Sequence, residues 1–258
     1  MRKPVIAGNW KCHKTSKEAG ELVRQLRHEL EAIQGVEVVV CPSFTALAAV
    51  AAQLDGSSVA LGAQDLFWEP QGAFTGEVSA PMLVDVGCRY CIIGHSERRQ
   101  HFGETDEQIR KKLVAAFTHG LIPILCIGET LTQRTQGQTF EIVRSQLMGA
   151  LKGLSEQELR RLVIAYEPVW AIGTGHNATP AEAQEAQAFI RQCLKTMWNA
   201  EVAETVRLQY GGSVTAANAA ELLQQPDVDG ALVGGASLSA ESFVAIVKAA
   251  VEVKLLTR

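Results

Sequence analysis

Eight short apolar segments recur along the chain, separated by segments with helical periodicity. They are rich in β-branched residues and lack the alternation of polar and apolar residues that marks a sheet with one solvated face. We predict strands at 5–8, 36–41, 59–63, 90–94, 122–127, 162–166, 206–209 and 231–233. Strands that are apolar throughout are buried on both faces, which is typical of a parallel sheet covered by helices.

A helical segment follows each predicted strand. Leu22, Leu26 and Leu30 show the spacing of a helix with one apolar face, and Ser16 ahead of Glu18 reads as its start signal. We predict helices at 17–33, 45–53, 80–86, 106–119, 139–151, 180–198, 216–224 and 240–254. Eight strand and helix units fit either an open doubly wound sheet or a closed (β/α)8 TIM barrel, and their number favours the α/β barrel.

Composition narrows the class of protein. The 258 residues are 47% hydrophobic and include no linker or low-complexity tract, so we expect one domain over 1–258. A net charge of -4 argues against nucleic-acid or anionic-membrane partners. The absence of an apolar run of about 18 residues argues against a membrane helix. Six dispersed cysteines fit no disulfide framework, which favours a cytoplasmic protein.

Polar residues follow several predicted strands directly. In a barrel the carboxyl ends of the strands meet on one rim, where active sites form. The residues at these ends are Asn9 and Lys11 after the first strand, His95, Ser96 and Glu97 after the fourth, Glu167 after the sixth, Gly211, Gly212 and Ser213 after the seventh, and Gly234 and Gly235 after the eighth. Each has a simpler interpretation: a solvated rim charge for Glu167, a core imidazole for His95, a surface amine for Lys11. Their convergence on one rim favours a binding site.

Six motifs carry a resemblance to a known family. They are NWK at 9–11, IIGHSERR at 92–99, LCIGE at 125–129, AYEPVWAIGTG at 165–175, YGGSV at 210–214 and LVGGASL at 232–238. Together, in this order and from Val5 to about Lys248, they resemble the triosephosphate isomerase family. The resemblance implies interconversion of dihydroxyacetone phosphate and D-glyceraldehyde 3-phosphate through an enediolate, in glycolysis and gluconeogenesis. It implies a small phosphorylated triose as substrate, with no metal and no cofactor.

The reaction needs one base and one group that stabilises an oxyanion. A carboxylate shielded from water gains basicity, which suits Glu167 as the base. His95 precedes a short helical turn, whose N-terminus disfavours the imidazolium and leaves a neutral ring to donate to the oxyanion. Lys11 would place a positive charge beside the substrate, and Asn9 would orient both. The resemblance implies the same assignment and places Glu97, with Ser96, beside these groups.

Glycine turns supply backbone N–H groups for the phosphate. We expect contacts at Gly173, at Ser213 after Gly211, and at Gly234 and Gly235, where a short helix follows. We expect a lid over 168–178, in line with the resemblance. Its first hinge is stiffened by Pro168 and Trp170, its second ends at Ala178, and Tyr210 and Ser213 latch it.

The segment 65–77 is long for a barrel loop. By resemblance it enters a partner subunit through Phe74, Thr75 and Gly76, which predicts a homodimer with Thr75 near the partner's active site. The simpler alternative is that segment 65–77 is a mobile surface loop. At its start, Asp65 stands where the family frequently has Asn.

Other functions remain to be weighed. The sequence GTGHNA at 173–178 matches a dinucleotide-binding pattern, but its first glycine does not follow the strand directly. Cys88 and Cys91 have metal-ligand spacing, but no second pair accompanies them. Another phosphate-binding barrel isomerase of sugar phosphates would share the glycine turns without the trio of Lys11, His95 and Glu167. A non-catalytic relative would have lost the base.

Overall fold

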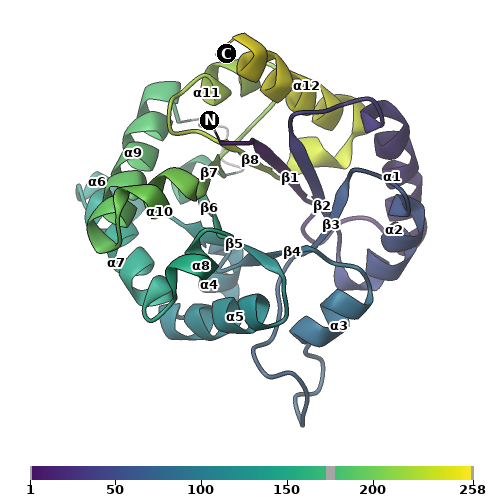
Figure 1. Cartoon of the computed structure of the whole chain (residues 1–258), viewed down its shortest axis with the longest axis horizontal. Coiled ribbons are helices and arrows are strands. Elements are labelled where there is room, and N and C mark those ends of the chain that lie inside the picture. The colour runs from purple at the N-terminus through teal and green to yellow at the C-terminus, as the bar shows by residue number, and fades with distance from the viewer. Residues whose placement is uncertain (1, 173–177, 257–258) are drawn as a thin grey trace.

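A closed barrel of parallel strands forms the centre of the molecule. The computed structural model describes residues 2–172 and 178–256. The strands are β1 (Val5–Asn9), β2 (Glu37–Cys41), β3 (Ala60–Ala63), β4 (Tyr90–Ile93), β5 (Ile122–Ile127), β6 (Val163–Tyr166), β7 (Arg207–Tyr210) and β8 (Gly230–Val233). They pair in chain order, and β1 closes the ring by pairing with β8 (Figure 1). The predicted (β/α)8 barrel is confirmed.

Helices surround the barrel on its outer side (Figure 1). They are α1 (Ser16–Leu30), α2 (Leu47–Leu54), α3 (Ala80–Asp85), α4 (Ser96–Phe102), α5 (Asp106–Thr118), α6 (Leu131–Thr135), α7 (Thr139–Leu151), α8 (Glu156–Leu159), α9 (Pro180–Met197), α10 (Ala200–Thr205), α11 (Ala219–Leu223) and α12 (Ala240–Leu256). Three 3-10 turns add η1 (Phe44–Ala46), η2 (Val169–Ala171) and η3 (Gly235–Leu238). The first helix starts one residue earlier than predicted, because Thr15 and not Ser16 caps it, in a reciprocal pair with Glu18.

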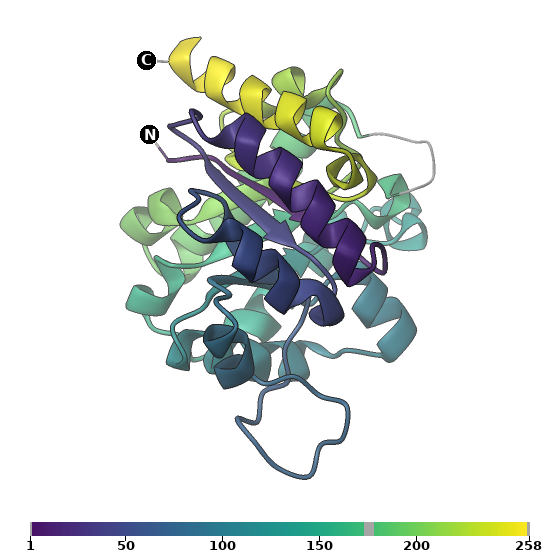
Figure 2. The ribbon, with the colours of Figure 1, turned by 90° about the vertical axis from the view of Figure 1, so that its right-hand side faces the viewer.

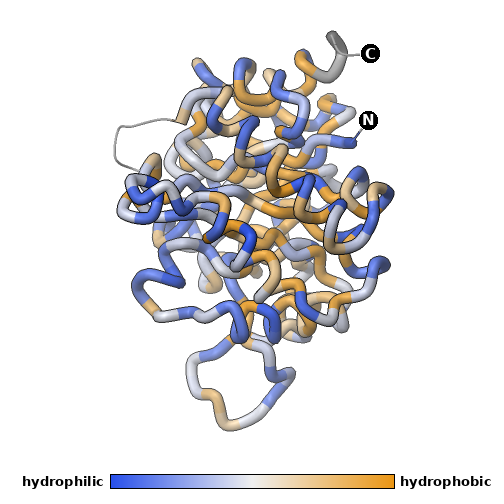
Figure 3. Tube along the Cα trace, turned by 90° about the vertical axis from the view of Figure 1, so that its left-hand side faces the viewer, coloured by the Kyte–Doolittle hydropathy of each residue, from blue (hydrophilic) through white to orange (hydrophobic). Residues whose placement is uncertain are grey.

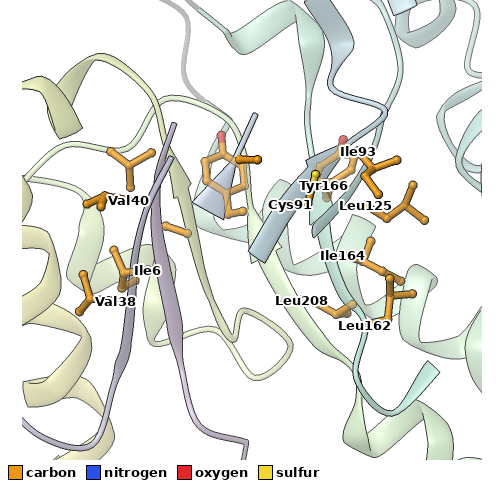
Figure 4. Packing of buried hydrophobic residues seen from close by; sticks show 14 of the residues in the cluster. Ile6, Val38, Val40, Cys91, Ile93, Leu125, Leu162, Ile164, Tyr166 and Leu208 are labelled. Atoms are coloured by element: carbon orange, nitrogen blue, oxygen red, sulfur yellow. The ribbon is translucent and has the colours of Figure 1, made fainter. Parts of the chain in front are cut away.

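Alternate residues of each strand face two different cores. Val5, Ala7 and Val39 belong to a cluster drawn from strands, which fills the barrel interior. Ile6 and Val38 belong to the larger cluster that the strands share with the helices (Figure 4). In Figure 3 the hydrophobic stretches of the trace gather toward the centre of the molecule, and hydrophilic stretches are more common toward its outside. Burial on both faces explains the uniformly apolar strands, since each fully buried Val or Ile stabilises the fold by about 1.5–3 kcal/mol.

The segment between β3 and α3 projects from the body of the protein (Figures 1 and 2). At its tip Phe74 is 43% exposed, and its ring lies 4.7 Å from that of Phe67, which in turn lies 4.2 Å from that of Trp68. At its base Asp65 is buried. Trp68 also packs against the body of the protein, with Lys111 Nζ 5.4 Å from its ring centre, whereas Phe74 remains exposed.

Within the described part of the chain, the helices are too short or too polar to cross a membrane.

Candidate active site

A cavity of about 280 Å³ opens at the carboxyl ends of the strands. Its size is at the lower end of the range for small-molecule sites. The residues predicted for catalysis or binding that line it are Asn9, Lys11, His95, Glu167, Ser213, Gly234 and Gly235. Gly211 and Gly212, predicted at the same strand ends, line it as well, so five strand ends contribute to one site. Gly173, the eighth predicted binding residue, lies outside the described residues.

The backbone at Lys11 is held in an unusual conformation. Lys11 has φ of 49°, a left-handed value that a non-glycine residue adopts only when its surroundings impose it. Asn9 supplies one restraint, because its Oδ1 accepts a hydrogen bond from the Lys11 N–H at 3.0 Å. Gln64 supplies another, since its Nε2 donates to the carbonyls of Lys11 and Cys41, each at 2.9 Å. Asn9 therefore orients Lys11 as predicted, through the backbone.

His95 is the N-cap of α4, as the predicted helical turn after the fourth strand requires. The backbone N–H of Glu97 donates to His95 Nδ1 at 3.3 Å. The Glu97 side chain accepts a hydrogen bond from Lys11 Nζ at 2.6 Å. Helix α4 thus presents the imidazole and, through Glu97, positions the ammonium group.

Glu167 is buried and fully hydrogen-bonded in this arrangement. Its Oε2 accepts from the Ser96 N–H at 2.9 Å, and its Oε1 accepts from the Ser96 hydroxyl at 3.3 Å. The same Oε1 lies 3.0 Å from His95 Nε2. Only 2% of the Glu167 surface is exposed. Ser96, predicted as a neighbour of the site, therefore binds the carboxylate directly.

The pKa values of Glu167 and His95 shift in the directions opposite to those that burial alone would give. Burial raises the pKa of Glu167, but the His95 ring and the Ser96 N–H outweigh it and lower the pKa overall. Burial lowers the pKa of His95, but the Glu167 carboxylate outweighs it and raises the pKa overall. In this arrangement each group stabilises the charged form of the other, which opposes the predicted neutral ring and strengthened base.

Glycines allow the close approach of backbone around the carboxylate. A Cβ at Gly211 would lie 2.9 Å from Glu167 Cγ, and one at Gly212 would lie 2.2 Å from the Tyr210 hydroxyl. A Cβ at Gly128 would lie 1.7 Å from the Glu167 carbonyl oxygen. Side chains at these positions would therefore displace the site. Gly234 and Gly235 lead into η3, the predicted short helix at the edge of the cavity.

Hydrogen bonds to a buried carboxylate hold the predicted first hinge. Pro168 precedes η2, which contains Trp170, and Trp170 Nε1 donates to Glu129 Oε1 at 2.9 Å. The Tyr166 hydroxyl donates to the same carboxylate, which is fully buried. Ala178, predicted to end the second hinge, is also buried. Between the two predicted hinges, Ile172 lines the cavity, and residues 173–177 fall outside the described residues.

Some residues near the site escape the sequence analysis. Gln64 directly follows β3, and Glu129 comes two residues after β5, so their position near a strand end was an available signal. Arg134 has no comparable signal, because it lies on the unpredicted helix α6. Conversely, Phe74, Thr75 and Gly76 do not line the cavity of their own chain. Across the described positions, no three His, Cys, Asp or Glu side chains come together as a metal site would require.

The chain is similar to known proteins along nearly its whole length. The family model described as triosephosphate isomerase matches residues 4–250. Among curated proteins, the triosephosphate isomerase of Moorella thermoacetica is 60% identical over 96% of this chain and 98% of its own. The corresponding proteins of Carboxydothermus hydrogenoformans and Chloroflexus aurantiacus are 56% and 58% identical, covering 97% and 96% of this chain and 100% and 99% of their own.

Proposed function

The chain belongs to the triosephosphate isomerase family, and on that premise we propose that its cavity interconverts dihydroxyacetone phosphate and D-glyceraldehyde 3-phosphate with Glu167 as the base. The activity is an aldose–ketose isomerisation, a step of glycolysis. The observation that carries the assignment is the 3.0 Å contact between the buried His95 Nε2 and Glu167 Oε1, in a cavity that Lys11 also lines. One base and one hydrogen-bond donor at this distance suit proton transfer between neighbouring carbons.

The carboxylate exchanges partners when substrate binds. In the arrangement described, Ser96 and His95 occupy the oxygens of Glu167 and lower its pKa. Turned toward a substrate carbon, Glu167 loses these hydrogen bonds but stays in a buried environment, which raises its basicity. His95 then loses the carboxylate that raises its pKa, while burial and the Glu97 N–H remain. The ring becomes a neutral donor to the enediolate oxygen, with its Nε2 facing the cavity.

Lys11 and Asn9 bind the substrate beside this pair. The ammonium group of Lys11 offers a charge to the substrate oxygens, and Asn9 holds its backbone in place. We propose that Ser213, Gly234 and Gly235 bind the phosphate, because all three line the cavity and η3 begins there. Backbone N–H groups at such turns bind anions without a basic cluster. Gly173 completes this set in the proposal, by resemblance.

We propose that the functional unit is a homodimer. The projecting segment with Phe74, Thr75 and Gly76 extends away from its own barrel, as an arm that enters a partner requires (Figure 2). Other exposed apolar side chains, Phe44, Met82 and Phe102, offer a surface to such a partner. Sedimentation of the purified protein tests this, and a fully active monomer would contradict it.

The extent of the catalytic domain and the location of the protein are proposed as well. We propose that residues 1–258 act as one catalytic domain, because the barrel elements run from Val5 to Leu256. We propose a cytoplasmic location, because the six cysteines are free thiols and five of them are buried. A different phosphate-binding barrel isomerase is not favoured, since it would not need Lys11, His95 and Glu167 together.

A coupled assay tests the function. Glyceraldehyde 3-phosphate is supplied, and formation of dihydroxyacetone phosphate is followed through a reporter enzyme. The wild type should turn over, and Glu167→Gln should lower kcat by roughly 10²–10⁴-fold while binding of inorganic phosphate persists. Glu185→Gln, the same change at an exposed position of α9, serves as control. Unchanged kcat in Glu167→Gln would refute the base assignment.

A further inference from the structure

Arg134, on the short helix α6, contacts both ends of the segment that joins β6 to α9. Its guanidinium lies over the ring of Trp170, 4.2 Å from the ring centre. Its Nη2 donates to Glu182 Oε1 at 2.5 Å. Trp170 lies three residues after Glu167, and Glu182 lies in the first turn of α9. One side chain therefore links the residues just after the base to the start of the following helix.

Trp170 and Glu182, the two residues that Arg134 contacts, each form further hydrogen bonds. Trp170 donates through Nε1 to the buried Glu129, and Arg134 Nη1 lies 3.5 Å from the same carboxylate oxygen. The second oxygen of Glu182 accepts from the N–H and hydroxyl of Thr179, at 2.8 and 3.0 Å, and so caps α9. A displacement of the Arg134 side chain would therefore affect both the Trp170 indole and the Glu182 carboxylate that caps α9.

We propose that Arg134 is a positioning residue for the isomerase reaction, holding Trp170 and hence the backbone of Glu167 at a fixed distance from the start of α9. The guanidinium is suited to this, because it stacks through its face and bonds carboxylates through its edge at the same time. An ammonium group does one or the other. The inference rests on the proposed function, since its effect is read through the turnover that Glu167 supports.

The expected signature is a loss of rate, which a residue that only stabilises the fold would not produce. Arg134 and Glu182 are each about one-third exposed, at 30% and 35%, so their ion pair stabilises the fold little. A displacement of a catalytic carboxylate by about 1 Å, in contrast, lowers the rate by up to about 100-fold. A residue with a merely structural role would show the opposite pattern, a lower melting temperature with unchanged kcat.

The experiment compares three variants with a matched control. Arg134→Ala should lower kcat by about tenfold, with a smaller change in KM. Arg134→Lys keeps the charge but not the stacked plane, and should lose nearly as much. Glu182→Gln keeps an oxygen for the Thr179 cap but loses the ion pair, and should lose less. In the control, Arg144→Ala removes an exposed arginine that lies 5.2 Å from the ring of Phe189 on outer helices, and kcat should not change.

Coupling between the two sites gives the decisive readout. If Arg134 and Glu182 act through one contact, the double variant Arg134→Ala with Glu182→Gln loses no more rate than Arg134→Ala alone. Wild-type kcat in Arg134→Ala, or an equal loss in Arg144→Ala, would overturn the proposal. Should Arg134→Ala fail to fold, unchanged kcat in both Arg134→Lys and Glu182→Gln overturns it, and a loss in both supports it. An inactive wild type would instead refute the proposed function.

Discussion

Replacing Asp65 by asparagine should stabilise the protein at alkaline pH. Asp65 is buried at the base of the projecting segment, and its carboxylate binds Lys112 Nζ at 2.6 and 2.8 Å and Arg98 Nε at 2.9 Å. Glu104 shares both cations, at 2.5 Å from each. Burial, with Glu104 adding to it, raises the pKa of Asp65 to about 6 against the opposing effect of Lys112 and Arg98. At pH 8 Asp65 is charged in the native state, but burial makes its ionisation less favourable there than in the unfolded chain.

The magnitude follows from proton linkage. A raised native pKa contributes stability below the unfolded value of 3.8, and this contribution is lost as pH rises through about 6. The difference between these values, at about 1.4 kcal/mol per pH unit, corresponds to about 3 kcal/mol. Asparagine is neutral at every pH, and Lys112 keeps Glu104 as its partner. Asp65→Asn should raise the free energy of unfolding by about 3 kcal/mol at pH 8 and by about half of that at pH 5.

Urea unfolding at several pH values and one protein concentration measures this difference. Asp85→Asn, the same change at an exposed carboxylate, is the control and should show little dependence on pH. The reasoning would be refuted by an Asp65→Asn variant that is less stable than the wild type at pH 8. A gain that does not change with pH would refute it equally, because the argument depends on ionisation.

Two further predictions concern residues that shape the site. Gln64→Ala frees the carbonyl of Lys11 and should lower kcat/KM by about tenfold, because the strained backbone of Lys11 relaxes; steady-state kinetics in the coupled assay tests this, and an unchanged kcat/KM contradicts it. Gly128→Ala places a Cβ 1.7 Å from the Glu167 carbonyl oxygen and should prevent stable folding. Gly20→Ala, in open space on α1, should instead stabilise the protein by about 0.5–1 kcal/mol. Thermal unfolding of both variants separates these effects, and equal melting temperatures would contradict the prediction for Gly128→Ala.

The barrel could be predicted from the sequence because the periodicity and the topology agree. Strands buried on both faces leave an uninterrupted apolar signal, and most of the helices between them are long enough to show a period. The short helices α6, α8 and α10 carry no such signal, since four to six residues are too few to show a period. Their place is fixed by caps, as in the reciprocal pair of Thr130 and Gln133.

The sequence predicts which residues form the site, but not how their side chains are turned or how their pKa values shift. Strand-end position located Asn9, Lys11, His95 and Glu167, because parallel strands bring their carboxyl ends together. The direction of the pKa of His95 was not accessible, since it depends on which way the Glu167 side chain turns. Side-chain rotamers of this kind are determined by hydrogen bonds across the barrel, and the sequence does not show them.

The pairing of β1 with β8 has a consequence for how the chain reaches its native state. Val5 lies opposite Gly230, so the ring closes through residues at nearly opposite ends of the chain. Contacts between such distant residues form slowly, because a long loop must be ordered first. Until β8 arrives, β1 presents an unpaired apolar edge to other nascent chains. Pairing of the final strand is therefore the step that removes this edge from contact with other chains.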